Sequence, residues 1–182
     1  MRYELLKLND SNAQSLIEMS KKWEAEQCTW GIVANSLSDL TEPIFVAIDN
    51  DKIIGYTFGH FYVVENKTSY IEIGSKCFMV DEIYVNPAYR NQGIGKTLFR
   101  MLEEYVKSDC QYITGSTSTK DYKKILNFYV DELDMNFHSA FLIKKMNYQY
   151  LRKFYKTSKS LSFFLRQWTC VLKKCDFYAI IN

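Results

Sequence analysis

The feature that most constrains this chain is a strand-like stretch joined to an amphipathic helix by a loop with two glycines. The stretch from Phe78 to Val85 is β-rich, and Pro87 breaks it. Gly93 and Gly95 let the backbone turn tightly and approach a ligand closely. Apolar residues then recur at helical spacing: Leu98, Met101, Leu102 and Tyr105. Free N–H groups and the positive end of a helix dipole therefore meet at one point, which predicts a site for an anionic ligand.

The loop matches neither common nucleotide-binding fingerprint. The pattern Gly-x-Gly-x-x-Gly fails because Leu98 takes the place of its third glycine. The P-loop spacing is also absent, although Gly95-Lys96-Thr97 is like its last residues. These departures disfavour a Rossmann domain and a P-loop NTPase.

The loop closely resembles motif A of the GNAT-type N-acetyltransferases, whose pattern is (Arg or Gln)-x-x-Gly-x-(Gly or Ala). The resemblance implies that acetyl-coenzyme A is the donor and that loop amides bind its pyrophosphate. It assigns cofactor binding to seven residues: Arg90, Asn91, Gln92, Gly93, Ile94, Gly95 and Lys96. The Arg90 side chain is then a phosphate partner, the alternative being a solvated loop charge. Lys96 lies in the first helical turn, where an anion nearby would explain a cation that opposes the dipole.

A second segment, residues 125–137, resembles the family's helix-to-strand signature, Phe-Tyr followed a few residues later by Gly-Phe. Asn136 stands where glycine is usual, and asparagine is the next-best residue for a left-handed helix end. The asparagine that often precedes this helix and contacts the cofactor has no clear counterpart in residues 118–122. The resemblance covers roughly residues 2–146.

The resemblance also implies roles in the transfer itself. Backbone groups of Ile83, Tyr84 and Val85 map onto those that bind the acetyl and pantetheine part of the donor. Tyr129, at the Phe-Tyr position, maps onto the acid that protonates the leaving thiolate. The alternative for Tyr129 is an aromatic core residue in a helix.

Two carboxylates are candidates for the base that takes the ammonium proton. Asp81 and Glu82 are adjacent in a strand, so we expect them on opposite faces with only one directed into the cleft. Glu82 shares its face with Tyr84 and is the first choice, with Asp81 as a second base or an anchor for the substrate ammonium. A water chain in place of a direct base stays open. Glu24, Glu26 and Glu72 could line an amine pocket, but the sequence assigns them no role.

The coarse pattern of elements predicts an α/β fold. We expect strands at 2–8, 44–48, 52–64, 78–85, 111–116 and 137–145. We expect helices from a cap at Asp10 or Ser11, near 30–37, and at 93–107 and 120–130. This order matches the GNAT acyltransferase fold, a mixed, mostly antiparallel sheet with helices on both faces.

The amino-acid composition suits a domain with a single hydrophobic core of modest size. The chain has 182 residues and is 47% hydrophobic, which suits a single catalytic domain, placed at 1–146. Its five cysteines show no Cys-x-x-Cys spacing and its two histidines are far apart, so neither a disulfide framework nor a metal site is expected. No apolar run approaches the roughly 18 residues of a membrane span, and a cytoplasmic location is the expectation.

Charge divides the chain near residue 146. Residues 1–146 hold 16 Lys+Arg and 20 Asp+Glu, whereas residues 147–182 hold 7 and 1. The extension, 147–182, follows the pattern of a basic amphipathic helix rich in aromatic residues. We expect it to be covered by the domain's own sheet or by a second subunit in a homodimer; a membrane surface and RNA are the alternatives. No nucleic-acid partner is expected, because nothing in 1–146 supports one.

The sequence thus predicts an acetyl-coenzyme A-dependent N-acetyltransferase that acts by direct transfer in a ternary complex. Its acceptor would be the primary amine of a small cationic molecule or a peptide, and no motif identifies it further. The alternative is a non-catalytic acyl-coenzyme A-binding regulatory module that keeps the glycine loop without turnover.

Overall fold

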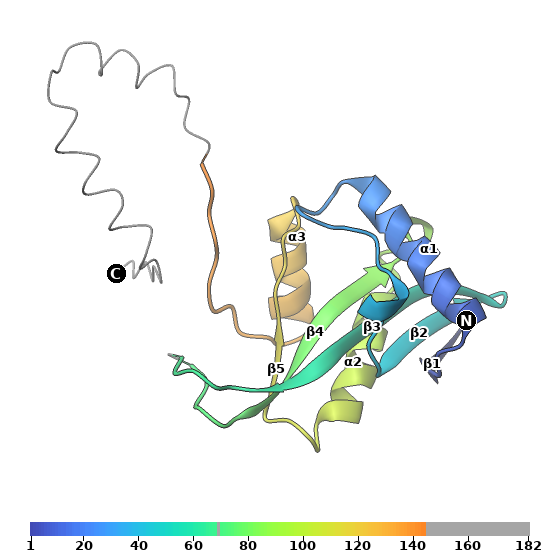
Figure 1. Ribbon diagram of the computed structural model, residues 1–182. Helices are drawn as coiled ribbons and strands as arrows, with labels where there is room; N and C mark the ends of the chain where they lie inside the picture. Colours follow the sequence, from blue (N-terminus) through green and yellow to red (C-terminus); the bar gives the residue numbers. More distant parts are fainter. Residues whose placement is uncertain (69, 145–182) are drawn as a thin grey trace, which may run out of the picture. The chain divides into compact units, whose positions relative to one another are not determined.

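Five strands form a single mixed sheet in the order β1-β2-β3-β4-β5 (Figure 1). The computed structural model describes residues 1–68 and 70–144. The strands are Arg2–Leu6 (β1), Ile44–Asp49 (β2), Lys52–Val63 (β3), Lys76–Val85 (β4) and Tyr112–Gly115 (β5). Neighbours from β1 to β4 pair antiparallel, whereas β4 and β5 pair parallel. The expected mixed, mostly antiparallel sheet is confirmed.

Two helices cover opposite faces of this sheet (Figure 1). Helix α1 (Asp10–Glu26) packs on what we call the α1 face, where Leu16, Tyr56 and Tyr84 are buried. Helix α2 (Ile94–Val106) packs on the α2 face, where Phe78 and Leu98 are buried. Short helical segments complete the described elements: Leu37–Asp39 (η1), Pro87–Tyr89 (η2), Tyr122–Leu126 (α3) and Asn127–Glu132 (η3). Residues 1–138 form one compact unit.

Helix α1 is capped by Asn9, one residue before the first of the expected caps, Asp10 and Ser11. The Asn9 side chain accepts from the Asn12 N–H at 3.0 Å, and the Asn12 side chain accepts from the Asn9 N–H at 2.8 Å. This reciprocal capping box satisfies two amide donors that the first turn leaves free. The helix ends at Gln27, which is left-handed with φ 49°.

Strand β4 contains a bulge that decides which side chains reach the α1 face. In the β3–β4 register Phe58 pairs with Glu82 but Gly59 pairs with Val80, so Asp81 is an extra residue. Val80 belongs to the α2 face, while Tyr84 belongs to the α1 face. Gly59 is required here, because a Cβ atom at this position would lie 1.9 Å from the Met79 carbonyl oxygen.

Two predicted elements are absent from the described residues. The helix expected near 30–37 is an irregular connection followed only by η1. At the start of this segment the backbone forms a hydrogen bond with a distant part of the chain, because the Trp30 N–H donates to the Ser118 carbonyl at 2.9 Å. The strand expected at 137–145 does not form over 137–144, and Lys145 lies outside the described residues.

The turn before that segment also differs from expectation. Asp134 has the positive φ, 59°, that was expected of Asn136. The Met135 N–H donates to the Tyr129 carbonyl at 3.0 Å, so the chain reverses two residues earlier than the family signature suggests. The extension at 147–182, and with it the predicted dimer contact, lies outside the described residues.

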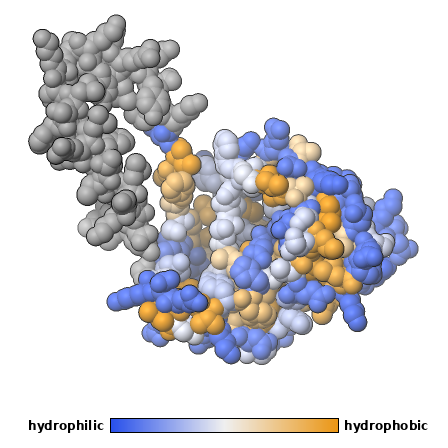
Figure 2. Space-filling view, in the orientation of Figure 1, coloured by the Kyte–Doolittle hydropathy of each residue, from blue (hydrophilic) through white to orange (hydrophobic). Residues whose placement is uncertain are grey.

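The α1 face carries exposed apolar side chains in the α1–β2 connection. Trp30, Val33 and Leu37 are each more than half exposed. Figure 2, in the same orientation as Figure 1, shows apolar patches among mainly hydrophilic side chains on this side of the molecule. None of the described helices has both the length and the apolar character needed to cross a membrane. Among residues 1–68 and 70–144, no group of three or more His, Cys, Asp or Glu side chains could hold a metal ion.

Candidate active site

Strand β4 has an open edge beyond the point where β5 leaves it. The parallel pairing ends at Val80 and Gly115, but β4 continues to Val85. On its other side the Asn86 N–H donates to the Ile54 carbonyl at 2.8 Å. Antiparallel alternation then directs the backbone groups of Tyr84 toward β3 and those of Ile83 and Val85 toward the open edge. Of the three predicted donor-binding residues, Ile83 and Val85 therefore present hydrogen-bonding groups there.

The glycine loop delivers α2 to the end of this edge. Asn86 starts the turn by accepting from the Ala88 N–H at 3.1 Å, and Asn91 and Gly93 both have positive φ, 61° and 76°. Gly93 caps α2 without a side-chain hydrogen bond. The first amides of the helix, at Ile94 to Lys96, thus lack the partner that a capping side chain supplies. The loop has the tight turn that the two glycines predict, and its role in binding an anion stays a prediction.

The segment after α3 closes over the start of α2. A Cβ atom at Gly95 would lie 3.4 Å from the Phe128 ring, so the two surfaces are in close contact. Tyr129 follows in η3 and packs against the α2-face cluster. Burial raises the pKa of Tyr129 to about 12. Its phenol therefore keeps its proton near neutral pH, as a general acid must.

Glu82 is held on the α1 face by two hydrogen-bond donors. Asn35 Nδ2 donates to Glu82 Oε2 at 2.9 Å, and the Tyr56 hydroxyl donates to the same oxygen at 2.8 Å. Both bonds use Oε2, which leaves Oε1 available for a proton. Burial raises the pKa of Glu82, the two hydrogen bonds oppose this rise, and the nearby charge of Asp81 adds to it. A carboxylate with a raised pKa is a stronger base.

Asn35 is itself fixed by a buried hydroxyl of α1. Its backbone N–H donates to Ser20 Oγ at 2.8 Å, and Ser20 Oγ donates to the Ile17 carbonyl at 2.8 Å. Ser20 is fully buried, so its two bonds satisfy a polar group that would otherwise cost stability. The α1–β2 connection is thereby anchored where it reaches Glu82.

Asp81 lies on the same face as Glu82, so the expectation of opposite faces is wrong. The His60 Nδ1 lies 2.8 Å from Asp81 Oδ2, and His60 follows Phe58 by two residues on the α1 face of β3. The bulge is the reason, because an extra residue breaks the two-residue alternation of the strand. Both carboxylates therefore lie on the α1 face.

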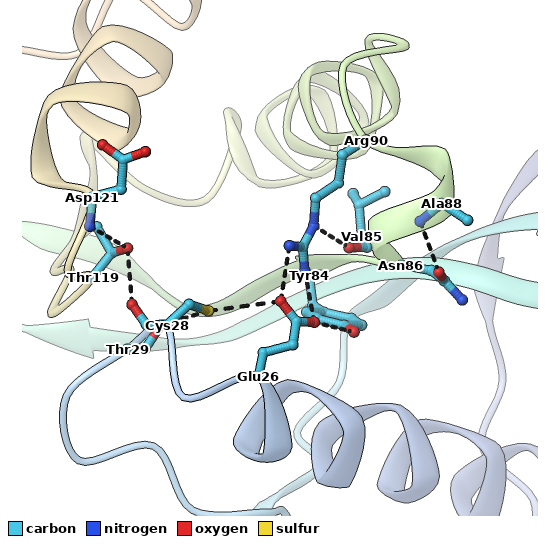
Figure 3. Close-up of polar contacts among 10 residues, drawn as sticks. All are labelled: Glu26, Cys28, Thr29, Tyr84, Val85, Asn86, Ala88, Arg90, Thr119 and Asp121. Carbon is cyan, nitrogen blue, oxygen red and sulfur yellow. Dashed lines mark hydrogen bonds and ion pairs between the residues drawn. The ribbon is translucent and has the colours of Figure 1, made fainter.

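Arg90 lies in an ion pair with the last residue of α1 (Figure 3). Its Nη1 and Nη2 contact the two Glu26 carboxylate oxygens at 2.8 and 2.9 Å, and its Nε donates to the Val85 carbonyl at 2.8 Å. The Tyr84 hydroxyl also donates to Glu26, at 2.8 Å. Burial opposes ionisation of Glu26, but the hydrogen bonds from Arg90 and Tyr84 outweigh it and lower its pKa. The phosphate contact expected of the Arg90 side chain stays a prediction.

The chain after α1 is tied to the connection between β5 and α3. The Lys120 N–H donates to the Cys28 carbonyl at 2.8 Å, and Thr29 and Thr119 form an isolated antiparallel bridge. Figure 3 shows a third link, in which the Thr119 hydroxyl donates to the Cys28 carbonyl at 3.4 Å, beside Glu26. The open edge of β4 is thus bordered by the glycine loop, the end of α1 and residues 118–120.

Sequence reasoning missed four residues that shape this site: Glu26, Asn35, Tyr56 and His60. Each reaches its partner across a wide gap in the chain, 64 residues for Glu26 and Arg90 and 47 for Asn35 and Glu82. No local spacing signals such pairs. The one available hint was Gly59 in the middle of a strand, which is a typical mark of a bulge.

A model of the Acetyltransferase (GNAT) family matches residues 4–134. A search of curated proteins found no match. Among solved structures, an acetyltransferase of Trypanosoma brucei is similar at 20% identity and TM-score 0.54, covering 80% of this chain and 100% of that one. A transcriptional regulator from Bacillus halodurans C-125 is similar at 17% identity and TM-score 0.59, covering 80% and 100%.

Aminoglycoside N-acetyltransferases are also among the similar structures. AAC(6')-Iy in complex with a bisubstrate analogue, CoA-S-monomethyl-acetylneamine, is 13% identical with a TM-score of 0.58. The match covers 81% of this chain and 99% of that one. At such identities these structures show a shared fold.

Proposed function

The chain belongs to the GNAT acetyltransferase family, and on that premise we propose that it transfers an acetyl group from acetyl-CoA to a primary amine. The transfer is direct, in a ternary complex, and the acceptor is a small cationic molecule or a peptide. The observation that carries this proposal is Glu82, a carboxylate of raised pKa anchored beside the open edge of β4. We place the catalytic domain at residues 1–146, with 147–182 as an extension.

The donor fits the backbone groups at the open edge. Ile83 offers an amide and a carbonyl group, and Val85 offers an amide group, which suit the pantetheine arm because it carries amides of its own. The loop from Arg90 to Lys96 ends in unpaired N–H groups at the positive end of α2, which suit a diphosphate. These groups are fixed by the fold before the donor arrives, so little reorganisation is needed at the reaction.

In this proposal Glu82 is the general base and Tyr129 is the general acid. Glu82 Oε1 takes a proton from the acceptor ammonium, either directly or through one water, which gives a neutral amine. The amine nitrogen attacks the thioester carbonyl carbon and the C–S bond breaks as the tetrahedral intermediate collapses. The thiolate takes the proton of the Tyr129 hydroxyl, the second proton of the amide nitrogen passes to the Tyr129 phenolate, and Glu82 releases its proton to solvent. The products are an acetylated amine and coenzyme A with a free thiol. Asp81, close to Glu82, is placed to hold the incoming ammonium.

The acidic side chains at this site favour a cationic acceptor. Asp81 and Glu82 lie on one face, whereas the charge of Glu26 is balanced by Arg90. Similarity in fold to aminoglycoside N-acetyltransferases is compatible with a polyamine-like acceptor. The proposal of a cationic acceptor therefore depends on the negative charge of these carboxylates.

Thiol release from acetyl-CoA across a panel of amines tests the proposal. The panel includes aminoglycosides, polyamines, amino acids and peptides, and the enzyme is the full chain. We expect amine-dependent release that falls by about 10²-fold or more in Tyr129→Phe. Donor binding without release from any amine would instead support a regulatory acyl-CoA-binding module.

A further inference from the structure

The Arg90 side chain is directed away from the first turn of α2. Figure 3 shows it running from the glycine loop toward the end of α1, where it meets Glu26. Three of its N–H groups are used, two on Glu26 and one on the Val85 carbonyl. Its guanidinium carbon also lies 5.5 Å from the centre of the Tyr84 ring. A side chain with this many short contacts is a fixed part of the fold.

Glu26 is a fixed anchor as well. It is the last residue of α1, and the left-handed Gln27 that follows it closes the helix with an N–H bond to Glu24. The chain immediately after it is held by the Cys28–Lys120 backbone bond at 2.8 Å. The Tyr84 hydroxyl fixes the orientation of the carboxylate from the strand side. Besides Arg90, the carboxylate is therefore held by the Tyr84 hydroxyl, and the backbone on its C-terminal side is held by two hydrogen bonds.

We propose that Glu26 and Arg90 form a strut that positions the glycine loop for the donor diphosphate. The inference rests on the proposed function and assigns Glu26 and Arg90 the role of positioning residues. Arg90 joins three parts: the loop to which it belongs, the end of β4 through Val85, and the end of α1 through Glu26. The diphosphate is then bound by loop amides whose direction depends on this strut.

The strut also determines which backbone groups the donor can use. By occupying the Val85 carbonyl, Arg90 removes the last acceptor of the open edge. The Ile83 N–H, the Ile83 carbonyl and the Val85 N–H stay available for the pantetheine arm. Arginine suits this position better than lysine, because its planar fork binds both carboxylate oxygens and a carbonyl at once.

The test is calorimetric titration of coenzyme A into the full chain and its variants. We expect Arg90→Lys, which keeps the charge and loses the fork, to weaken coenzyme A binding about tenfold. Glu26→Gln should also weaken it, by about fivefold, although it removes a negative charge near an anionic ligand. The double variant Glu26→Gln/Arg90→Lys should bind no more weakly than Arg90→Lys alone, because both changes break one strut.

Matched variants separate the strut from a general loss of structure. Arg100→Lys is the control, since Arg100 lies in α2 and its ion-pair partners are Glu103 and Asp134, each at 2.7 Å, neither of which belongs to the strut. It should leave coenzyme A affinity within twofold of wild type. Tyr84→Phe removes a single hydrogen bond to Glu26 and should weaken binding about fourfold, beyond the range allowed for the control, which keeps the test valid if Glu26→Gln unfolds.

Two results would overturn the inference. Tighter binding in Glu26→Gln would show that Glu26 withholds Arg90 from the diphosphate, which makes Arg90 a direct phosphate ligand. Additive losses in the double variant would show two independent contributions. Failure of the wild-type chain to bind coenzyme A would instead contradict the proposed function itself.

Discussion

The donor side and the acceptor side of β4 are built in different ways. The donor side is contiguous, since Ile83, Val85 and the loop through Lys96 follow one another in the chain. The acceptor side is assembled from separate elements, with Asn35, Tyr56 and His60 meeting Asp81 and Glu82. In the proposed function, backbone groups bind the donor, whereas side chains make up the acceptor site. A common donor can thus be bound by one short motif, while the acceptor depends on the whole fold.

The largest expected effect comes from the acceptor side. Glu82→Gln keeps the shape of the side chain and removes the base, so we expect amine-dependent thiol release to fall by about 10² to 10⁴-fold. Release is measured with a saturating amine from the panel. Glu72→Gln is the control, because Glu72 is exposed and lies outside the site. A Glu82→Gln rate within twofold of wild type would favour a water chain as the base.

The bulge that joins the two sides should be nearly as sensitive. Gly59→Ala places a Cβ atom where it would lie 1.9 Å from the Met79 carbonyl, so β3 and β4 must separate. We expect the free energy of unfolding to fall by about 3 kcal/mol, measured by urea denaturation. Gly115→Ala, whose Cβ atom would lie 4.0 Å from the Val80 side chain, should cost less than about 1 kcal/mol. Equal losses in the two variants would contradict the tight contact at the bulge.

A moderate effect is expected on the donor side. Gly93 has φ 76°, a conformation that costs most L-residues about 1 to 2 kcal/mol, so Gly93→Ala should weaken coenzyme A binding about fivefold or more. Gly93→Asn should lose less, because asparagine tolerates this conformation. Calorimetry reports both affinities. Similar affinities for alanine and asparagine would indicate that the backbone conformation of the loop does not limit binding.

The smallest effect is a shift in pH dependence. Burial raises the pKa of Glu82 and the Asp81 charge raises it further, so kcat/KM should increase with pH through a value above that of an ordinary glutamate. Wild type, Asp81→Asn and Glu82→Gln are assayed with the same amine. Asp81→Asn should move the rise in kcat/KM to lower pH, and Glu82→Gln should abolish this rise. If the rise in kcat/KM with pH were unchanged in Glu82→Gln, a group other than Glu82 would be responsible for it.

The raised pKa of Glu82 also makes the free energy of unfolding depend on pH. Between the ordinary glutamate pKa and the raised one, the folded state binds more protons than the unfolded state, so the free energy of unfolding falls as pH rises through this interval. In Glu82→Gln the free energy of unfolding should no longer fall over this pH interval. Urea denaturation of both proteins across this interval measures the difference, and parallel pH profiles would contradict the raised pKa.

Local signals account for what the sequence predicts well. The helix expected at 93–107 is found at Ile94–Val106, and the strand expected at 78–85 lies within β4. Their signals are the spacing of apolar residues and two glycines, which act over a few residues. The fold follows from the same patterns, because the order of strands and helices limits how a mixed sheet can form.

Long-range contacts account for what the sequence misses. Residues 30–37 do not form a helix, and Trp30 bonds to Ser118, a partner that the local sequence does not indicate. The shared face of Asp81 and Glu82 depends on a bulge opposite Gly59, and strict alternation predicts the opposite. Glu26 had no assigned role because its partner, Arg90, lies 64 residues away.

The most direct test of the account measures binding and turnover in the same preparations of the wild-type chain and Glu82→Gln. Coenzyme A affinity is measured by calorimetry, and thiol release from acetyl-CoA is measured with one amine of the panel. We predict affinities that agree within twofold and release that falls by about 10²-fold or more in the variant. Absence of coenzyme A binding by the wild-type chain would contradict the donor site at β4, and equal release by both proteins would contradict the central role of Glu82 as the base.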